Sequence, residues 1–443
     1  MYVTRIATKK FKCFTSIDVE LPKLTLLTGA NSSGKSSFLC ALLLPFQSVG
    51  FPFYLSPNGK YINMGDFIEM AHCNRKKEII GLDLTFLYDS GEKVEFSTRW
   101  ILDPKSSLPA LKSLRIRGMF VDISVAKAPK GLGYILNLRT DVKAYYRSKH
   151  FETDKIFSSF IDSVQKLMPK QYGRKKKLFE KTRRLSLKLR NTRLEEIEAR
   201  LNSMAVSPVT SILTIFNMFE RNMNYIGSFH QEPERTYYQR LKGDRRIGRS
   251  GENYIEQIIE WERRRVPEYH ALCDSLKKLG LLTGLKTRLL RGGRFEVGVK
   301  THRSGVWASL TDVGYGISQF LPIVVADVQL SKGSTLAVAQ PEIHLHPKVQ
   351  AALGDYFVER IRNQGKRYII ETHSEYLLNR IRLLIVKGKI KPSEVGIYHF
   401  QCSGCEAKVY RLAFTKSGKI EGAPQDFFDT YMMDVMDIAM EAK

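Results

Sequence analysis

The 443-residue chain carries 70 Lys and Arg residues against 45 Asp and Glu residues, and its formal net charge of +25 favours polyanionic partners, first nucleic acid and then a membrane surface or an acidic protein. The length exceeds the roughly 100–200 residues of one domain, so it predicts two or three units or one large domain with an insertion. The six cysteines are scattered, no apolar leader is present and no apolar run reaches the roughly 18 residues of a membrane helix. We therefore expect a cytoplasmic protein without a membrane-spanning segment.

The first part of the chain has the pattern of a β-rich lobe. Residues 1–30 indicate strand, turn and strand, because alternation of polar and apolar residues gives way to the apolar run Leu24–Gly29. Further alternating segments separated by turn residues occupy Lys76–Trp100 and Ala110–Val125. They predict an antiparallel subdomain that completes a first lobe over residues 1–140.

A basic segment follows this lobe. Tyr145–Met204 is compatible with helix and dense in Lys and Arg, which predicts a basic helical insertion over residues 141–224. Apolar residues between Leu187 and Leu201 recur at coiled-coil spacing, but for fewer than three heptads, so long coiled-coil arms are not expected. The basic residues are compatible with DNA binding, with binding of an acidic protein and with a solvated helix face, and the sequence leaves the three open.

The strongest local pattern is a glycine-rich loop between an apolar strand and a helix-compatible segment. Residues Gly29–Ser36 fit the pattern GxxxxGK[ST] in that context. Backbone N–H groups of such a loop surround phosphate, and the helix N-terminus adds positive potential. The loop predicts an ATP site with Mg²⁺, in which Lys35 reaches the terminal phosphates and the Ser36 hydroxyl binds the metal. The predicted binding residues are Asn31, Ser32, Ser33, Gly34, Lys35, Ser36 and Ser37.

The residues around the loop carry a family resemblance. The run FKCFTSIDVELPKLTLLTGANSSGKSSFL, Phe11–Leu39, resembles the N-terminal lobe of ABC-type ATPase heads of the SMC and OLD kinds. In pieces, the resemblance covers residues 1–130 and 225–443. It implies an α/β fold, namely an ABC-type P-loop ATPase head with a mixed sheet, flanking helices, an antiparallel β subdomain and the basic insertion. It also implies a helical linker region over residues 225–294 and a C-terminal ATPase lobe over residues 295–443.

Two further segments resemble motifs of such heads. SLTDVGYGISQFLP, Ser309–Pro322, resembles the signature loop of a subgroup of OLD-like ATPases, which caps the γ-phosphate held by a second subunit. The resemblance implies phosphate contacts in trans from Gly314, Gly316 and Ser318, and hence a homodimer or higher homo-oligomer. RYIIETHSEYLLNRI resembles the switch segment, in which His373 senses the γ-phosphate.

A third segment departs from the form that is usual in the same subgroup. YIGSFHQEPERTYY, Tyr225–Tyr238, has His230 where the subgroup usually has Arg, while Arg235 is retained. The role of the replaced Arg is therefore open in this chain.

Two short patterns have the spacing of metal ligands. For Cys402 and Cys405, in a single CxxC without a second pair, we favour a β-hairpin turn over a zinc site. His344 and His346 occupy the position of the D-loop in the resembled heads, and for them we favour contacts at a subunit interface.

The strand before Gln340 lacks the acids that such heads use. In ABC-type heads it ends Asp-Glu, where the Asp holds Mg²⁺ through water and the Glu orients the attacking water. Here Ala339 and Gln340 stand at those positions, and Gln cannot accept a proton. Loss of a well-placed base costs ~10²–10⁴ in rate, so we expect an ATPase with slow turnover. The candidate catalytic residues are Gln340, Glu342, Glu371 and His373.

The resemblance implies an ATP-binding switch or sensor of bacterial anti-phage defence that controls a separate effector, as in PARIS-type systems. OLD nucleases carry a Toprim domain after the ATPase, whereas only about seventy residues follow His373. A toxin or nuclease effector is therefore expected in trans, with DNA or a phage protein as the trigger. Two alternatives stay open: a DNA-repair or chromosome-associated ATPase of the SMC/RecF kind, and a scaffold that binds ATP without hydrolysing it.

Overall fold

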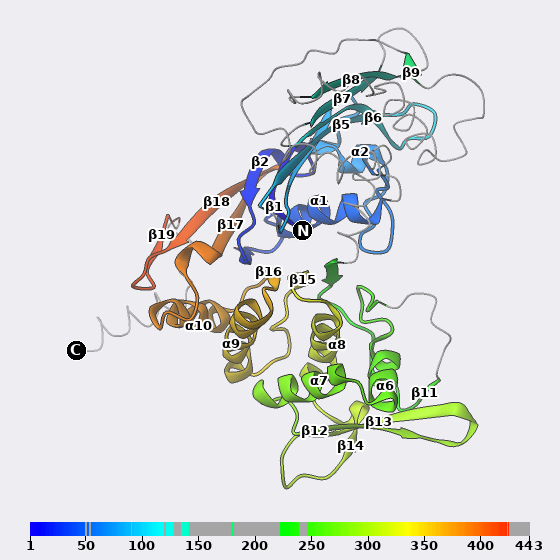
Figure 1. The fold of residues 1–443 in the computed structure, drawn as a ribbon, viewed down its shortest axis with the longest axis vertical. Coiled ribbons are helices and arrows are strands. Elements are labelled where there is room, and N and C mark those ends of the chain that lie inside the picture. Colours follow the sequence, from blue (N-terminus) through cyan, green and yellow to red (C-terminus); the bar gives the residue numbers. More distant parts are fainter. Residues whose placement is uncertain are drawn as a thin grey trace, which may run out of the picture. The chain divides into compact units, whose positions relative to one another are not determined.

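The computed structural model describes residues 1–48, 51–52, 55–89, 91–118, 121–127, 134–140, 179–180, 222–238, 246–422 and 424. The chain divides into two compact units (Figure 1). The first consists of Met1–Glu20, Ser37–Arg221 and Ser403–Ala407, and the second of Leu21–Ser36, Asn222–Cys402 and Lys408–Lys443. The expected basic insertion lies almost entirely outside the described residues.

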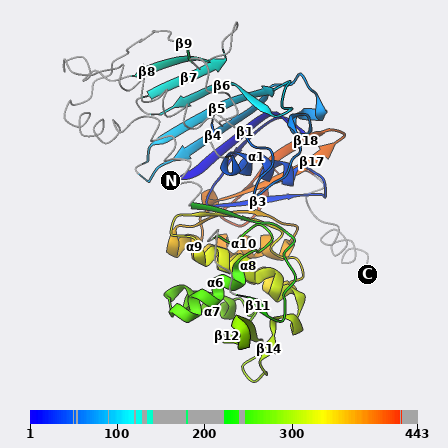
Figure 2. The same ribbon diagram turned by 90° about the vertical axis from the view of Figure 1, so that its right-hand side faces the viewer.

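The first unit is built on an eight-stranded sheet with the strand order β2-β1-β4-β5-β6-β7-β8-β9 (Figure 2). Its strands are β1 (Tyr2–Phe11), β2 (Phe14–Glu20), β4 (Ile80–Leu87), β5 (Lys93–Leu102), β6 (Pro109–Arg117), β7 (Val121–Lys127), β8 (Tyr134–Thr140) and β9 (Phe179–Glu180). All neighbouring pairs are antiparallel except β8 with β9. The predicted antiparallel β subdomain is confirmed. The short helices α2 (Phe67–Met70) and η1 (His72–Asn74) belong to the same unit.

The second unit is built on a seven-stranded sheet with the order β10-β15-β16-β3-β17-β18-β19. Its strands are β3 (Leu24–Gly29), β10 (Met223–Ile226), β15 (Thr335–Ala339), β16 (Arg367–Glu371), β17 (Val395–Ser403), β18 (Glu406–Phe414) and β19 (Ile420–Glu421). From β10 to β17 neighbouring strands are parallel. The central strands are continuous buried runs, as is typical of parallel strands covered on both faces. With the antiparallel pair β18 and β19, the mixed sheet confirms the predicted α/β fold class.

The helices of the second unit are α6 (Tyr254–Arg264), α7 (Pro267–Lys278), α8 (Tyr315–Gln329), α9 (Pro347–Gln364) and α10 (Glu375–Val386), and α1 (Lys35–Gln47) begins in it. A smaller sheet contains β11 (Tyr237–Tyr238), β12 (Gly284–Leu289), β13 (Arg294–Lys300) and β14 (Ala308–Ser309). The region 225–294, expected to be a helical linker, thus holds strands besides α6 and α7. No helix in the described part of the chain is both long and apolar enough to cross a bilayer.

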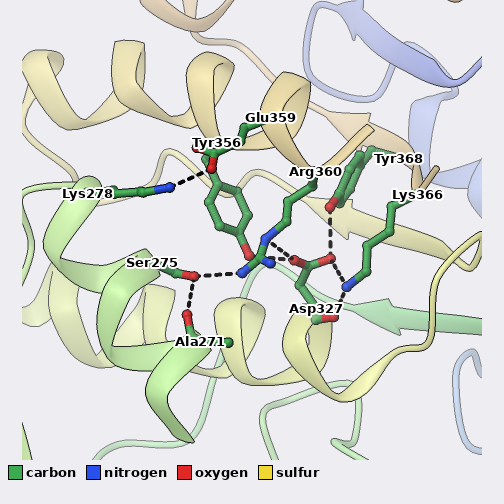
Figure 3. Close-up of polar contacts among 9 residues, drawn as sticks. All are labelled: Ala271, Ser275, Lys278, Asp327, Tyr356, Glu359, Arg360, Lys366 and Tyr368. Atoms are coloured by element: carbon green, nitrogen blue, oxygen red, sulfur yellow. Dashed lines mark hydrogen bonds and ion pairs between the residues drawn. The ribbon is translucent and has the colours of Figure 1, made fainter. Parts of the chain in front are cut away.

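A buried polar cluster joins α8 to α9 and β16 (Figure 3). The carboxylate of Asp327, on α8, is fully buried and accepts hydrogen bonds from the hydroxyls of Tyr356 (2.5 Å) and Tyr368 (2.9 Å). Lys366 Nζ lies 3.1 Å and Arg360 Nε 3.4 Å from its oxygens. A buried charge is tolerated only when it is paired and hydrogen-bonded in this way. The cluster therefore fixes the second half of α8 against the strand that ends at the candidate site.

The cluster extends to α7 through one guanidinium. Arg360 donates to the hydroxyl of Ser275 over 2.6 Å, and that hydroxyl donates to the carbonyl of Ala271 over 2.5 Å. Burial lowers the pKa of Lys366, and the carboxylate of Asp327 opposes that effect. Two cations and one carboxylate are thus held within the same packed interior.

Candidate functional site

The glycine-rich loop connects β3 with α1, as the sequence predicts. Gly29 has φ +132°, and a Cβ at this position would lie 2.2 Å from the backbone oxygen of Phe400 and 2.9 Å from the Ser33 hydroxyl oxygen. Only glycine fits there, because both the backbone conformation and the space exclude a side chain. Gly34 also has a positive φ, of +110°, directly before the first residue of α1. The chain thus turns sharply enough for the first turn of α1 to face the loop.

Lys35, the first residue of α1, lies within the loop. Its side chain is buried, and Nζ donates to the carbonyls of Gly29 (2.8 Å) and Ala30 (2.7 Å). Burial lowers the pKa of Lys35, and the nearby carboxylate of Glu371 opposes that effect. Because the hydrogen bonds of this buried ammonium go to neutral carbonyls, it gains strongly from an anion, so the loop fits a phosphate group.

A carboxylate lies beside the loop, on the strand next to β3. Glu371, the last residue of β16, pairs in register with Leu27 of β3 on one side and with Ala339 of β15 on the other. Both of its carboxylate oxygens lie 3.5 Å from the Ser36 hydroxyl. The acid that is absent from the end of β15 is therefore present at the same level on the neighbouring strand. A serine hydroxyl and a carboxylate are oxygen ligands that suit Mg²⁺, so this pair fits the metal of a nucleotide complex.

Burial raises the pKa of the Glu371 carboxyl, and the ammonium of Lys35 opposes the increase. The carboxyl is nearly inaccessible to water, so its ionised form depends on positive charge close by. A divalent cation at Ser36 would supply that charge.

The other candidate catalytic residues follow β15 and β16. The backbone N–H of Gln340 donates to the carbonyl of Glu371 over 2.7 Å, and Gln340 has the left-handed φ of +49°. Oε1 of Glu342 accepts the backbone N–H of His373 over 2.7 Å, while its buried Oε2 has no hydrogen-bond partner among the described residues. Burial raises the pKa of this carboxyl as well. Gln340, Glu342, Glu371 and His373 are therefore brought together beyond the carboxyl ends of two adjacent strands, where ligands of α/β sheets bind.

The signature-like residues lie at the start of α8. Gly314 is the N-cap of the helix and is exposed, whereas Ser318 is buried and its hydroxyl donates to the carbonyl of Tyr315 over 2.8 Å. A Cβ on Gly316 would lie 2.4 Å from the backbone oxygen of His344, so α8 approaches that segment closely. None of the three expected phosphate contacts forms a hydrogen bond to residues 29–36. The structure thus places Glu371 beside the loop, with Gln340, Glu342 and His373 in the segments that follow the same two strands. The phosphate contacts expected in trans stay a prediction.

Two residues of the motif Tyr225–Tyr238, His230 and Arg235, contact the signature segment. The sequence pointed to both residues but not to their partners. The guanidinium of Arg235 binds both carboxylate oxygens of Asp312, at 2.7 and 3.1 Å. The ring of His230 lies between the backbone oxygens of Gln319 (Nδ1, 2.5 Å) and Gly227 (Nε2, 2.9 Å). Burial lowers the pKa of this His, and the two carbonyls oppose that effect. Only the replacement of Arg by His in the motif signalled a special environment at this position.

The patterns with metal-like spacing have other local structures. Cys402 lies on β17 and Cys405 in the turn before β18, which confirms the expected hairpin. His346 caps α9 by accepting the backbone N–H of Lys348, and the ring of His344 contacts that of Tyr315 edge-on, with centroids 5.1 Å apart. Within the described residues, no cluster of three or more His, Cys, Asp or Glu side chains has the geometry of a metal site.

We expect Gly29→Ala to abolish nucleotide binding, because the added Cβ meets the Phe400 carbonyl and the backbone conformation is strained for alanine. Binding of a fluorescent ATP analogue would measure the loss. Gly365→Ala is the matched control, since Gly365 also has a positive φ, of +65°, but a Cβ there meets open space. That control should bind nucleotide normally and lose about 1–2 kcal/mol of stability, the cost of the left-handed conformation for alanine. Normal binding by Gly29→Ala would contradict the role of this glycine.

Comparison with known proteins places these features in context. The profile of a family described as an AAA ATPase domain matches residues 1–378. Among solved structures, the SMC head domain from Thermotoga maritima is similar at 10% identity and a TM-score of 0.42, covering 92% of this chain and 98% of that one. The SmcHead bound to the C-winged helix domain of ScpA is similar at 12% identity and a TM-score of 0.46, covering 94% of this chain and 99% of that one. The Smc head domain with an extended coiled coil bound to the C-terminal domain of ScpA, derived from Pyrococcus furiosus, is similar at 13% identity and a TM-score of 0.42. The match covers 100% of this chain and 99% of that one. No curated protein matches the chain.

Proposed function

Because the chain belongs to the family of AAA ATPase domains, we propose that it is an ATP-dependent switch that binds ATP tightly and hydrolyses it slowly. The observation that carries the proposal is the pair formed by Ser36 and Glu371 beside an otherwise intact phosphate loop. This pair supports a metal–nucleotide complex, while no carboxylate occupies the end of β15, where a general base is expected. Binding is thereby retained and the chemical step is weakened.

Each residue of the site has a distinct task in this proposal. ATP supplies the phosphoanhydride that is hydrolysed and Mg²⁺ supplies positive charge beside it. The loop 29–36 binds the phosphates through its backbone N–H groups and the ammonium of Lys35. Ser36 and Glu371 hold the metal.

The residues that follow the two strands act on the attacking water and on the γ-phosphate. The amide of Gln340 positions the water without accepting its proton. Glu342 accepts the backbone N–H of His373, and this contact would position the imidazole of His373 for a hydrogen bond to the γ-phosphate. Glu342 is also an alternative base in this proposal, because one of its buried oxygens has no partner in the described part of the chain.

We further propose that a second copy of the chain completes the site. The exposed N-terminus of α8 at Gly314 offers backbone N–H groups to a phosphate, and Gly316 and Ser318 shape the same turn. ATP would then join subunits into a dimer or higher homo-oligomer. The resemblance of the signature and switch motifs to OLD-like ATPases supports a cytoplasmic role in anti-phage defence, with a toxin or nuclease effector in trans. DNA or a phage protein is the proposed trigger.

ATP turnover with and without DNA tests this proposal. We expect slow turnover that DNA does not stimulate, together with ATP that stays bound and a larger species during gel filtration. Lys35→Ala should remove both the bound nucleotide and the larger species, because the buried ammonium is the main charge of the loop. Rapid turnover stimulated by DNA would instead identify a DNA-repair motor. Retention of ATP without any turnover would identify a scaffold.

A further inference from the structure

The small sheet of the second unit has two faces of opposite character. Leu285 on β12 and Phe295, Val297 and Val299 on β13 are buried and join the hydrophobic core. The alternate residues of both strands face away from that core, as the two-residue period of a strand requires. The outward face begins at the exposed Arg294 and continues to Lys300. A strand rise of about 3.3 Å per residue gives this face a length of roughly 20 Å.

The outward face and its flanking loops are strongly basic. Between Gly284 and Leu310 the only acidic residue is Glu296. Six cations occupy the same stretch, and none of them forms an ion pair with any residue that the structure describes. We call them the basic face; they are Lys286, Arg288, Arg291, Arg294, Lys300 and Arg303. Some exposed cations elsewhere in the described chain, such as Arg5 and Lys278, have carboxylate partners, so the basic face differs from those sites in keeping six cations together without one.

Two exposed aromatic rings lie among these cations. Tyr238 pairs directly with Arg294 across β11 and β13, so the two side chains share one face, and the tyrosine is 58% exposed. Trp307 is 44% exposed and packs over the backbone of Gly284, where a Cβ would lie 2.8 Å from its ring. Lys286 Nζ lies 4.1 Å from the centroid of the same ring. Cations and aromatic rings therefore lie next to one another along this face, Tyr238 beside Arg294 and Trp307 beside Lys286.

We propose that the basic face binds a single strand of nucleic acid. Cations that have no ion pair among the described residues and that recur along a strand match a phosphate backbone, and exposed rings between them offer stacking surfaces to bases. Bases present their faces only when they are unpaired, so a single strand uses both features whereas a duplex uses only the cations. This inference concerns a surface separate from the phosphate loop and does not depend on nucleotide hydrolysis.

Glycines make the face suitable for this role. Gly284 and Gly298 lie on β12 and β13, and Lys286 pairs with Gly298 across the strands. Without side chains at these two positions, the ring of Trp307 lies against the strand backbone, and a Cβ at Gly298 would come within 3.6 Å of it. A large side chain at Gly284 would displace the ring that we assign to stacking.

Fluorescence anisotropy with a labelled 15-nucleotide oligothymidine tests the proposal, using the full chain without ATP over a series of salt concentrations. The double variant Lys286→Gln/Arg288→Gln should bind at least about tenfold more weakly. The slope of the logarithm of the binding constant against the logarithm of the salt concentration should become shallower by about 1.4, since each phosphate contact on a single strand contributes about 0.7 to that slope. The matched control Lys387→Gln/Lys389→Gln removes two exposed cations from the loop after α10 and should stay within about twofold of the original chain.

Trp307→Leu separates stacking from charge. We expect this variant to lose about 5- to 150-fold in affinity for oligothymidine, the effect of one stacked base, with little change for a duplex of the same length. Urea unfolding of each variant, compared with the unaltered chain, shows that the fold is intact. Three outcomes would overturn the proposal: equal losses in the Lys286/Arg288 variant and the control, equal losses of single strand and duplex in Trp307→Leu, or competition by polyglutamate as effective as by oligothymidine.

Discussion

Glu371→Gln is expected to raise the Mg²⁺ concentration required for half-maximal ATP turnover by about 10- to 100-fold, with a comparable loss of rate at limiting Mg²⁺. The substitution keeps the shape of the side chain but removes the charge that lies 3.5 Å from the Ser36 hydroxyl. Binding of ATP in the absence of metal should change little, because Lys35 and the loop backbone remain. Steady-state turnover across a Mg²⁺ series, with nucleotide binding measured in chelator, provides the measurement.

The matched control for this substitution is Glu359→Gln. Glu359 is a half-exposed carboxylate on α9 that pairs with Lys278, remote from the loop in sequence and in hydrogen bonding. The Glu359→Gln substitution should leave both the rate of ATP turnover and its Mg²⁺ dependence unchanged. An unaltered Mg²⁺ dependence in Glu371→Gln would show that the carboxylate does not serve the metal.

The pH dependence of turnover follows from the same carboxyl. The carboxyl of Glu371 must be ionised to hold the metal, and burial raises its pKa above the usual 4.5. Turnover should therefore fall as the pH drops through this raised pKa, and saturating Mg²⁺ should move the acid limb to lower pH because the cation favours the ionised form. The Glu371→Gln variant should lack this limb.

The second large effect is expected on stability. Asp327→Ala should lower the free energy of unfolding by about 3–5 kcal/mol, because it leaves the buried cations of Lys366 and Arg360 without their carboxylate. The hydroxyls of Tyr356 and Tyr368 lose their acceptor at the same time. Urea unfolding followed by circular dichroism measures the change.

Asp18→Ala provides the comparison for Asp327→Ala. Asp18 also binds a guanidinium, that of Arg5, through both of its carboxylate oxygens, but the side chains of Asp18 and Arg5 are each about half exposed. Exposed pairs contribute about 0–1 kcal/mol, so this variant should unfold almost as the unaltered chain does. Equal effects of the two substitutions would mean that the cluster around Asp327 adds nothing beyond an ordinary surface pair.

Local features of the site were predictable from sequence. The loop Gly29–Ser36 lies between a strand and a helix as expected, since its signal consists of adjacent residues. The antiparallel strands between Ile80 and Lys127 were likewise apparent from their alternation. The strand β12 was missed, because its exposed Lys and Arg residues and its short length obscure the period of two.

Features that depend on register between distant segments were not predictable. Sequence reasoning named Glu371 as a substitute for the missing acid, but its position level with Ala339 follows only from the pairing of β15 with β16. The partners of Asp327 lie 29 to 41 residues away in the chain, on α9 and β16. In the sequence, this Asp only interrupts an apolar run. Packing of separate elements creates its environment, and no local pattern encodes that.

The pairing of Ala339 with Glu371 limits how this site can be altered. Position 339 is buried, and a carboxylate placed there would stand directly across from the one already present on the next strand. Like charges at paired positions repel, and the repulsion is stronger where water is excluded. An Asp restored at position 339 would therefore face the acid at 371, and without a cation between them the two carboxylates would repel each other. The small side chain of Ala339 is thus a structural complement to Glu371, and the strand that looks defective in the sequence is matched to its neighbour.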